Sequence, residues 1–300
     1  MLRKIRGDDL FRYYLLSVSV LVLFVIILVF LELFSNSLLA LRIFGIKFFI
    51  RNIWDPIKRE FSALPFIFGT FYTASLALIV SYMISVLVAY ALTEIVPRWI
   101  AEYISALVDL IAAIPSVVIG LWGIFYLIPL IRDVIYPALK PLSFIPLFSG
   151  ATYGFSYLAA TLVLIFMITP IQVSIFREAF LSVPRDLKDA LYALGATRYE
   201  VARHVVIPYS RRAMMAGVIL AYGRALGETL AVTMVIGNKP NITLSLLSPG
   251  YTLASVIANE FLEATDPLYS SSLIALGLVL MIISLIVNIV GYIIIRRAQR

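Results

Sequence analysis

Six long apolar runs constrain the fold of this chain more than any other feature of its sequence. A helix needs roughly 20 mostly apolar residues to cross the hydrocarbon core of a bilayer. Runs of that length occupy residues 12–34, 66–93, 103–131, 150–176, 213–236 and 268–295. None of them alternates polar and apolar residues with a period of two, which disfavours a membrane β-barrel. The sequence therefore predicts an all-α, polytopic membrane protein with six transmembrane helices.

The composition also indicates lipid as the solvent of this chain. Hydrophobic residues make up 62% of it and charged residues 14%, against about 45–50% and about 25% in a typical soluble domain. Arg3, Lys4 and Arg6 precede the first run and would suit a signal peptide. However, that run continues at spanning length, and no small-residue cleavage site closes it. We therefore expect an uncleaved first helix.

The distribution of Lys and Arg predicts the topology. Fifteen of them fall on the side that holds both termini and eight on the other side. The positive-inside rule then gives a multi-pass protein of the cell (plasma) membrane with cytoplasmic N- and C-termini. One loop argues the other way, because residues 35–65 carry five basic side chains on the predicted outside. Topology accounts for most of the net charge of +7, so we expect no nucleic-acid partner.

Several kinds of chemistry are excluded or disfavoured by what the chain lacks. It has no cysteine and a single histidine, His204, so neither a thiolate nucleophile nor a multi-histidine metal site is available. The phosphate-binding pattern Gly-x-x-x-x-Gly-Lys-Ser/Thr is also missing. We therefore expect no metal, no cofactor and no catalytic activity. An intramembrane enzyme is disfavoured, and any ATP would be hydrolysed by a partner.

The longest polar segment, residues 177–212, has the pattern of two short helices. Pro184 suits the first turn of a helix, and Gly195 suits a helix stop. Thr197 and Glu200 then have the spacing of a capping box. The alternative interpretation is a solvated basic loop. We predict two helices joined at the glycine, the second ending before the next proline.

This segment resembles the cytoplasmic coupling loop of ABC-importer permeases, which carries Glu-Ala-Ala, a glycine three residues later, and a late proline. The matching positions are Asp189, Ala190, Gly195, Ile207 and Pro208. Asp replaces the usual Glu, Leu the second Ala, and Ile the residue before the proline. The resemblance implies that this loop docks on a cytosolic ATPase.

Two opposite charges stand inside the fifth apolar run. Arg224 and Glu228 are four residues apart, so on a continuous helix they would share a face and pair. Gly223 and Gly227 have the same spacing, which favours the close approach of another helix. A structural ion pair is one interpretation. The other is an anion site in a translocation path, because the planar, permanently charged guanidinium fits a tetrahedral oxyanion.

The same stretch resembles the PstC-type permease of phosphate ABC importers. The matching motifs are Gly-Arg-Ala-Leu-Gly-Glu-Thr at residues 223–229, Val-Ile-Gly-Asn at 235–238, Ile-Pro-Ser at 114–116 and Ala-Ser-x-Ile-Ala-Asn-Glu-Phe at 254–261. The resemblance implies a MetI-like permease fold, inorganic phosphate as substrate, and transport roles for Arg224 and Glu228. It also implies three protein partners: a second permease subunit (PstA type), an ATPase dimer (PstB type) and an external phosphate-binding protein (PstS type).

These inferences divide the chain into three parts: an N-terminal helix and external loop (1–65), a permease core (66–295) and a cytoplasmic tail (296–300). Asp109, an acid within the third run, is a further candidate site residue, unless it lies wet at the cytoplasmic end. Two other functions remain open: a permease for sulfate, molybdate or another oxyanion, and a secondary transporter.

Overall fold

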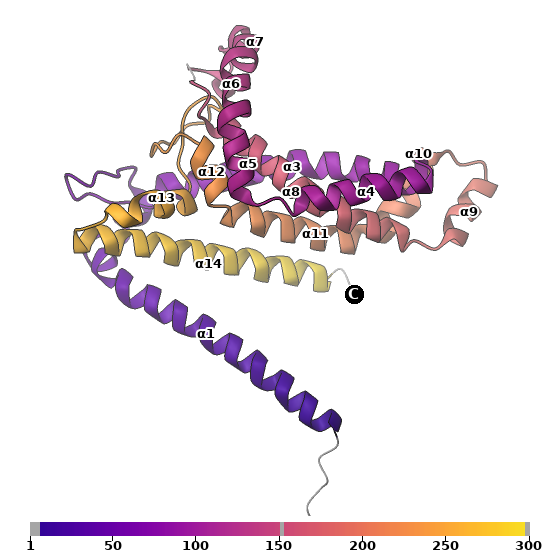
Figure 1. The fold of residues 1–300 in the computed structure, drawn as a ribbon, viewed down its shortest axis with the longest axis horizontal. Coiled ribbons are helices and arrows are strands. Elements are labelled where there is room, and N and C mark those ends of the chain that lie inside the picture. The colour runs from indigo at the N-terminus through magenta and orange to yellow at the C-terminus, as the bar shows by residue number, and fades with distance from the viewer. Residues whose placement is uncertain (1–6, 151–152, 298–300) are drawn as a thin grey trace, which may run out of the picture.

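The computed structural model describes residues 7–150 and 153–297, and helices dominate it (Figure 1). Four long helices run alongside one another: α3 (Leu64–Tyr90), α8 (Tyr157–Leu181), α11 (Ile207–Gly227) and α14 (Pro267–Arg297). The side chain of Ser156 accepts a hydrogen bond from the amide of Ala159 and so caps the start of α8. Helix α8 is the most buried of the four, which makes it the centre of the bundle.

Helix α1 (Gly7–Phe44) joins this bundle only through its C-terminal part, which packs on α14. The hydroxyl of Ser271 donates to the carbonyl of Asn36 at 2.7 Å and accepts from the amide of Ala40 at 3.2 Å. Residues 11–29 are exposed along their whole length, and Figure 1 shows this part of the helix diverging from the bundle. The first apolar run is therefore a long helix that this chain alone does not cover.

The third apolar run is not one continuous helix, so the prediction for residues 103–131 is wrong. Helix α4 (Arg98–Ala112) ends before Pro115, whose ring lacks an N–H and disfavours helical backbone in the residue before it. The chain then changes direction sharply (Figure 1). It continues as α5 (Ser116–Trp122), η2 (Gly123–Leu127), α6 (Ile128–Leu130), η3 (Ile131–Ile135), α7 (Tyr136–Leu139) and η4 (Lys140–Leu142).

The fifth apolar run is also broken, which corrects the prediction of one helix over residues 213–236. Helix α11 ends at Gly227, and Glu228 adopts an extended backbone with ψ of 127°. The short helix α12 (Leu230–Val235) follows and packs against α5. A Cβ at Gly120 would lie 2.5 Å from the sulfur of Met234, so glycine lets α5 and α12 approach closely.

Five helical segments among the described residues are long and apolar enough to cross a membrane. They are Phe11–Phe44, Leu64–Ile95, Ser116–Leu142, Tyr157–Leu181 and Pro267–Arg296. Four of them confirm the first, second, fourth and sixth predicted runs. Helix α11 is long enough but carries three arginines, which lower its hydropathy. The all-α membrane fold is confirmed, whereas six uninterrupted spans are not.

The remaining helices gather at the two ends of the bundle. At one end lie α2 (Lys47–Ile50), η5 (Pro146–Phe148), α13 (Leu253–Glu260) and η7 (Phe261–Glu263). There the carboxylate of Glu260 accepts from the indole of Trp54 at 2.8 Å and from the hydroxyl of Tyr269 at 2.7 Å. At the other end lie η1 (Ala91–Ile95), α9 (Arg185–Ala193), α10 (Arg198–Val201) and η6 (Ala202–Val206). The sites described next lie within the bundle and at this second end.

Candidate functional site

Arg224 occupies the last turn of α11 with its side chain exposed. Within residues 7–150 and 153–297, no ion pair or hydrogen bond engages its guanidinium. Insertion scales put the cost of an arginine at the centre of a membrane helix at about 2.5–3.5 kcal/mol. A cation at such a position without a partner in its own chain is therefore available to a group from outside the chain.

Glu228 contacts the start of α12 and not Arg224. Its side chain is buried, and its Oε1 accepts a hydrogen bond of 3.3 Å from the amide of Ala231, in the first turn of α12. The predicted pairing of Arg224 with Glu228 is therefore wrong. The spacing of four residues places two side chains on one face only while the helix continues, and α11 has ended at Gly227.

C-terminal to Arg211 and Arg212, the exposed face of α11 carries a single charge, Arg224. Ala213, Ala216, Leu220, Arg224 and Gly227 are all exposed and recur at helical spacing. A Cβ at Gly227 would meet no other atom within 4 Å. A Cβ at Gly223 would meet only Asn288 of α14, at an ordinary 3.8 Å, so among the described residues the glycine pair does not bring another helix unusually close. This part of the face, which carries Arg224 among small and apolar residues, is open to another molecule.

Asp109 lies near the C-terminal end of α4, away from the end of the bundle where Arg98 lies. It is the twelfth residue of α4, roughly 16 Å along the axis from Arg98 at 1.5 Å per residue. Its carboxylate accepts a hydrogen bond of 2.6 Å from the hydroxyl of Ser174 on α8. The contact ties α4 to the central helix, and the rest of the Asp109 side chain is exposed.

The polar segment at the other end folds as two short helices, as predicted. Gly195 separates α9 from α10 with φ of +85°, a conformation that side chains with a Cβ rarely adopt. Thr197 and Glu200 form the predicted capping box, in which the amide of Thr197 donates to Glu200 at 2.7 Å. Hydrogen bonds from the backbone and then the hydroxyl of Thr197 hold the pKa of the Glu200 carboxyl below its ordinary value.

The second short helix does not end before Pro208, which corrects that prediction. The wide turn of η6 leads directly into α11, so the chain stays helical from Arg198 to Gly227. Pro208 falls in the first turn of α11, where the hydrogen-bond register changes and a missing N–H is tolerated. Of the coupling-loop positions named from the sequence, Ile207 is half-buried and the other four are exposed: Asp189, Ala190, Gly195 and Pro208.

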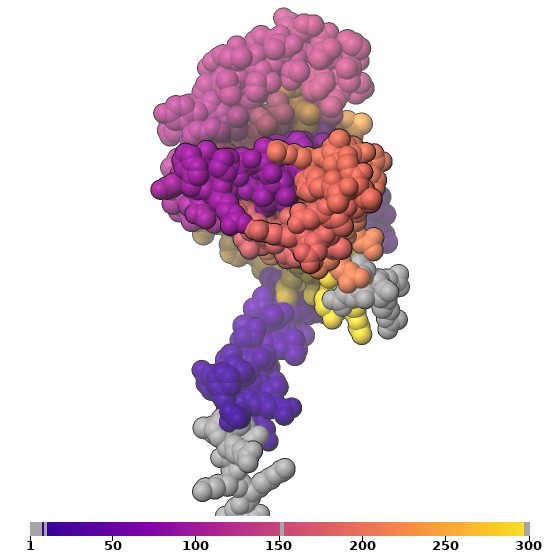
Figure 2. Space-filling view, turned by 90° about the vertical axis from the view of Figure 1, so that its right-hand side faces the viewer, coloured from indigo at the N-terminus to yellow at the C-terminus, as the bar shows by residue number. Residues whose placement is uncertain are grey.

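Large apolar side chains are exposed at the tip of this loop. Leu194 is 86% exposed and Tyr199 is 67% exposed, and none of the residues of α9 is buried. Figure 2 faces this end, with the α4 region in purple and the loop in orange on either side of a hollow. Exposed apolar patches of this kind mark interaction surfaces.

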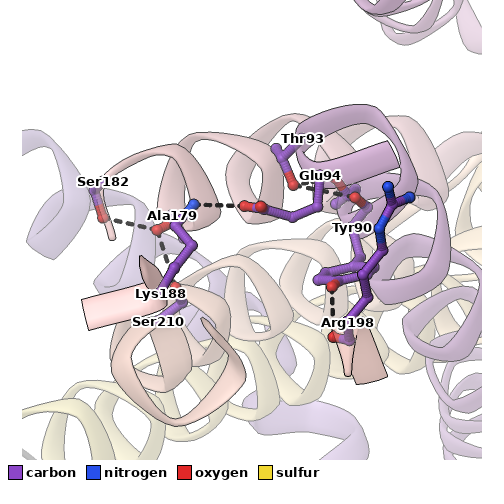
Figure 3. Close-up of polar contacts among 9 residues, drawn as sticks. Tyr90, Thr93, Glu94, Ala179, Ser182, Lys188, Arg198 and Ser210 are labelled. Carbon is purple, nitrogen blue, oxygen red and sulfur yellow. Dashed lines mark hydrogen bonds and ion pairs between the residues drawn. The ribbon is translucent and has the colours of Figure 1, made fainter. Parts of the chain in front are cut away.

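An ion pair that no sequence pattern indicates joins this loop to the bundle. The ammonium of Lys188 on α9 lies 2.6 Å from the carboxylate of Glu94 in η1, and each side chain is 13% exposed (Figure 3). The two residues are 94 positions apart, so no local pattern connects them. They line a cavity of about 570 Å³ together with Arg98, Glu102 and Arg185.

Gln172 was not predicted as a site residue, because it is a single amide side chain within an uncharged run. Gln172 is fully buried in α8, and its Oε1 accepts a hydrogen bond from Ser85 on α3 at 3.3 Å. Its amide nitrogen is among the described buried atoms that have no partner. No group of three or more metal-ligating side chains occurs among the described residues.

Comparisons with known proteins agree with this architecture. Residues 81–300 match the family model described as binding-protein-dependent transport system inner membrane component. The phosphate transport system permease protein PstC of Xylella fastidiosa (strain 9a5c) is 40% identical over 304 residues, covering 100% of this chain and 94% of that protein. The probable phosphate transport system permease protein PstC of Methanocaldococcus jannaschii is 42% identical over 279 residues, covering 91% of this chain and 88% of that protein.

A solved structure extends the comparison to the fold. A chain of a bacterial alginate ABC transporter, determined in complex with an alginate pentasaccharide-bound periplasmic protein, superposes with a TM-score of 0.63. The alignment covers 98% of both chains at 16% sequence identity. At that identity the similarity concerns the fold alone.

Proposed function

The chain belongs to the family of binding-protein-dependent transport system inner membrane components, and on that premise we propose that it is the PstC-type permease subunit of an ABC importer for inorganic phosphate. The chain is a non-catalytic membrane subunit, and ATP is hydrolysed by a separate subunit of the importer.

The single observation that carries the substrate assignment within this chain is the unpaired Arg224 on the exposed face of α11. Phosphate carries negative charge at neutral pH, and a guanidinium offers it two parallel charge-assisted hydrogen bonds. Because Glu228 is held by the turn to α12, it does not neutralise the guanidinium. We infer that Arg224 binds the passing anion, and that Glu228 acts by fixing the break that presents Arg224.

We propose that the exposed face of α11 meets a second permease of PstA type, so that the anion path lies between the two subunits. The loop of α9 and α10 would dock on an ATPase dimer of PstB type through its exposed apolar tip, with Asp189, Ala190 and Gly195 on the docking side. A phosphate-binding protein of PstS type would deliver the anion at the opposite end, near α13. Asp109 is a weaker candidate for the path.

The proposed orientation puts the N- and C-termini and the loop of α9 in the cytoplasm. In Figure 1 helix α14 ends toward the same side as α9, which supports this arrangement. The basic loop at residues 35–65, which argued against it, packs at the other end. There Arg59 pairs with Asp266 at 3.3 Å and Lys58 with Asp55 at 3.4 Å, so part of its charge is balanced within the chain.

Uptake by reconstituted vesicles tests the proposal. The complete importer, with this chain, its partner permease, its ATPase and its binding protein, is placed in proteoliposomes loaded with ATP. We expect ATP-dependent entry of radiolabelled phosphate. An excess of unlabelled phosphate should suppress this uptake, whereas sulfate or molybdate at the same concentration should not. Stronger competition by sulfate or molybdate would reassign the substrate, and uptake without ATP would indicate a secondary transporter.

A further inference from the structure

We propose that Glu94 and Lys188 are positioning residues that couple movement of the docking loop to the membrane helices. This inference rests on the proposed function, because it concerns how the importer links ATP hydrolysis to phosphate movement. Glu94 lies in η1, between α3 and α4, and Lys188 lies on α9. Their ion pair therefore joins the loop to the turn from which two bundle helices extend.

Helix α9 has few other attachments to the bundle. None of its residues is buried, and it packs mainly on α10 and η6 within the same loop. Leu191 adds a partly buried apolar contact with the cluster around Phe180 and Val206. With so little apolar burial, the position of α9 relative to the bundle depends strongly on the 2.6 Å contact between Lys188 and Glu94.

The second loop helix is held one turn away on the same part of the bundle. The hydroxyl of Tyr90, the last residue of α3, donates to the backbone carbonyl of Arg198 in α10 at 2.8 Å. Tyr90 and Glu94 are four residues apart, about one helical turn. Figure 3 shows both contacts leaving neighbouring positions of the same segment, one toward α9 and the other toward α10.

Helix α3 connects this point to the neighbourhood of Arg224. Its Ser75 hydroxyl lies 3.1 Å from the hydroxyl of Tyr222, two residues before Arg224 on α11. Ser75 and Tyr90 belong to one uninterrupted helix, roughly 22 Å apart at 1.5 Å per residue. A displacement of the loop at Glu94 would therefore be carried along a rigid element to the proposed anion site.

The local backbone suits a hinge. Glu94 lies in a π-helical turn, a form often found at functional positions, and an extended stretch at Val96 and Pro97 follows before α4. The charged cavity beside the pair gives the side chains room to move. Removal of either partner leaves the other as an unpaired and largely desolvated charge, which weakens the attachment of α9.

The test uses the complete importer in proteoliposomes, with phosphate uptake and ATP hydrolysis measured together. We expect Glu94→Gln and Lys188→Met each to lower the phosphate moved per ATP at least threefold. The exchanged variant, Glu94→Lys with Lys188→Glu, should recover at least half of the wild-type ratio. Glu178→Gln is the matched control, because Glu178 is a 70% exposed carboxylate at the same end that pairs with Arg177, and its ratio should stay unchanged.

A spin-label measurement does not depend on which anion is carried. Because the chain has no cysteine, labels at Trp99→Cys on α4 and Ala193→Cys on α9 report one distance. We expect a narrow distribution that nucleotide does not broaden in the wild type and a broad one in Lys188→Met. Equal loss of uptake and hydrolysis with an unchanged distance distribution would reduce the pair to a structural role and overturn the inference. Failure of the wild type to carry phosphate would overturn the proposed function instead, and the distances would still decide the role of the pair.

Discussion

Arg224 and Glu228 contrast with Glu94 and Lys188. The first two charges stand four residues apart on an apolar run and do not meet. The second two are 94 positions apart and form a contact of 2.6 Å. Nearness in the chain creates a pair only where the helix is continuous, whereas the fold can bring distant residues together. In this chain the ion pair of Glu94 and Lys188 joins η1 to α9, whereas Arg224 remains available to a group from another molecule.

The energetic consequence differs as well. In a largely buried ion pair, the attraction between the two charges offsets the cost of removing them from water. The loss of one partner therefore leaves the other charge unpaired and disturbs the structure around it. Arg224 has no such partner among the described residues, so its removal should lower transport activity and leave the fold intact. The following predictions test this difference, starting with the largest expected effect.

Arg224→Ala should lower phosphate uptake about a hundredfold, because about 3 kcal/mol of charge-assisted hydrogen bonding to the anion is lost. Thermal unfolding of the complex should stay within about 1 °C of the wild type, since no hydrogen bond or ion pair within the described residues is broken. Arg224→Lys keeps the charge but loses the planar fork, and we expect an intermediate rate. Arg132→Ala, which removes an exposed arginine paired with its neighbour Asp133, is the control. Normal uptake by Arg224→Ala would refute the site.

Gly195→Asp should reduce uptake about tenfold while ATP hydrolysis continues. A side chain at φ of +85° costs about 1–2 kcal/mol and shifts the join between α9 and α10. No atom lies within 4 Å of the position where a Cβ would stand, so a clash is not the cause. The measurement is the ratio of phosphate moved to ATP hydrolysed in vesicles. An unchanged ratio would argue against docking through this loop.

Gly120→Ala should lower the stability of the chain by about 1–3 kcal/mol, because the added methyl would press on Met234 of α12. The shift of α12 should also loosen the bond between Glu228 and Ala231. Gly277→Ala is the matched control, since its methyl would meet only ordinary contacts at 3.8 Å and 3.9 Å. Thermal unfolding in detergent compares the two variants, and equal melting temperatures would contradict the close packing of α5 and α12.

The smallest effect concerns the capping box at the start of α10. Thr197→Ala should cost about 1 kcal/mol of local helix stability. Because the folded pKa of Glu200 is lowered, its stabilising contribution is present above the unfolded value and is lost as the pH falls through the folded value. After correction for the intrinsic pH dependence of exchange, the protection factors of the backbone amides of residues 198–202 should therefore fall in acid for the wild type. In Glu200→Gln this acid effect should be absent, and its persistence would assign the effect to another group.

Much of the fold was predictable because it follows from local rules. The uncharged runs at residues 66–93 and 150–176 became α3 and α8, because a bilayer-length apolar segment can satisfy its backbone only as a helix. The capping box at Thr197 and the left-handed Gly195 follow from chemistry within a few residues. The break at Pro115 was harder to predict, because a proline within a membrane helix produces either a kink or a break, depending on its surroundings.

The site was only partly predictable. Arg224 stands out as a charge in an apolar run, but its lack of a partner depends on a helix end at Gly227 that the sequence does not mark strongly. The ion pair of Glu94 with Lys188 depends on the packing of α3, α8 and the loop, and no spacing rule reaches across 94 residues. Contacts of this range are set by tertiary structure and not by local patterns.

The packing of α1 against α14 has a consequence for the order of synthesis. Asn36 and Ser271, which share a hydrogen bond, are separated by 235 residues. At about 5–20 residues per second, roughly 12 to 47 s pass between the translation of the two. During that time α1 lies in the bilayer before α14, the helix it packs against, has been synthesised. During this interval a chaperone-like membrane factor or a neighbouring subunit can bind the exposed surface of α1. The rate of translation therefore sets the order in which the helices of this protein can assemble.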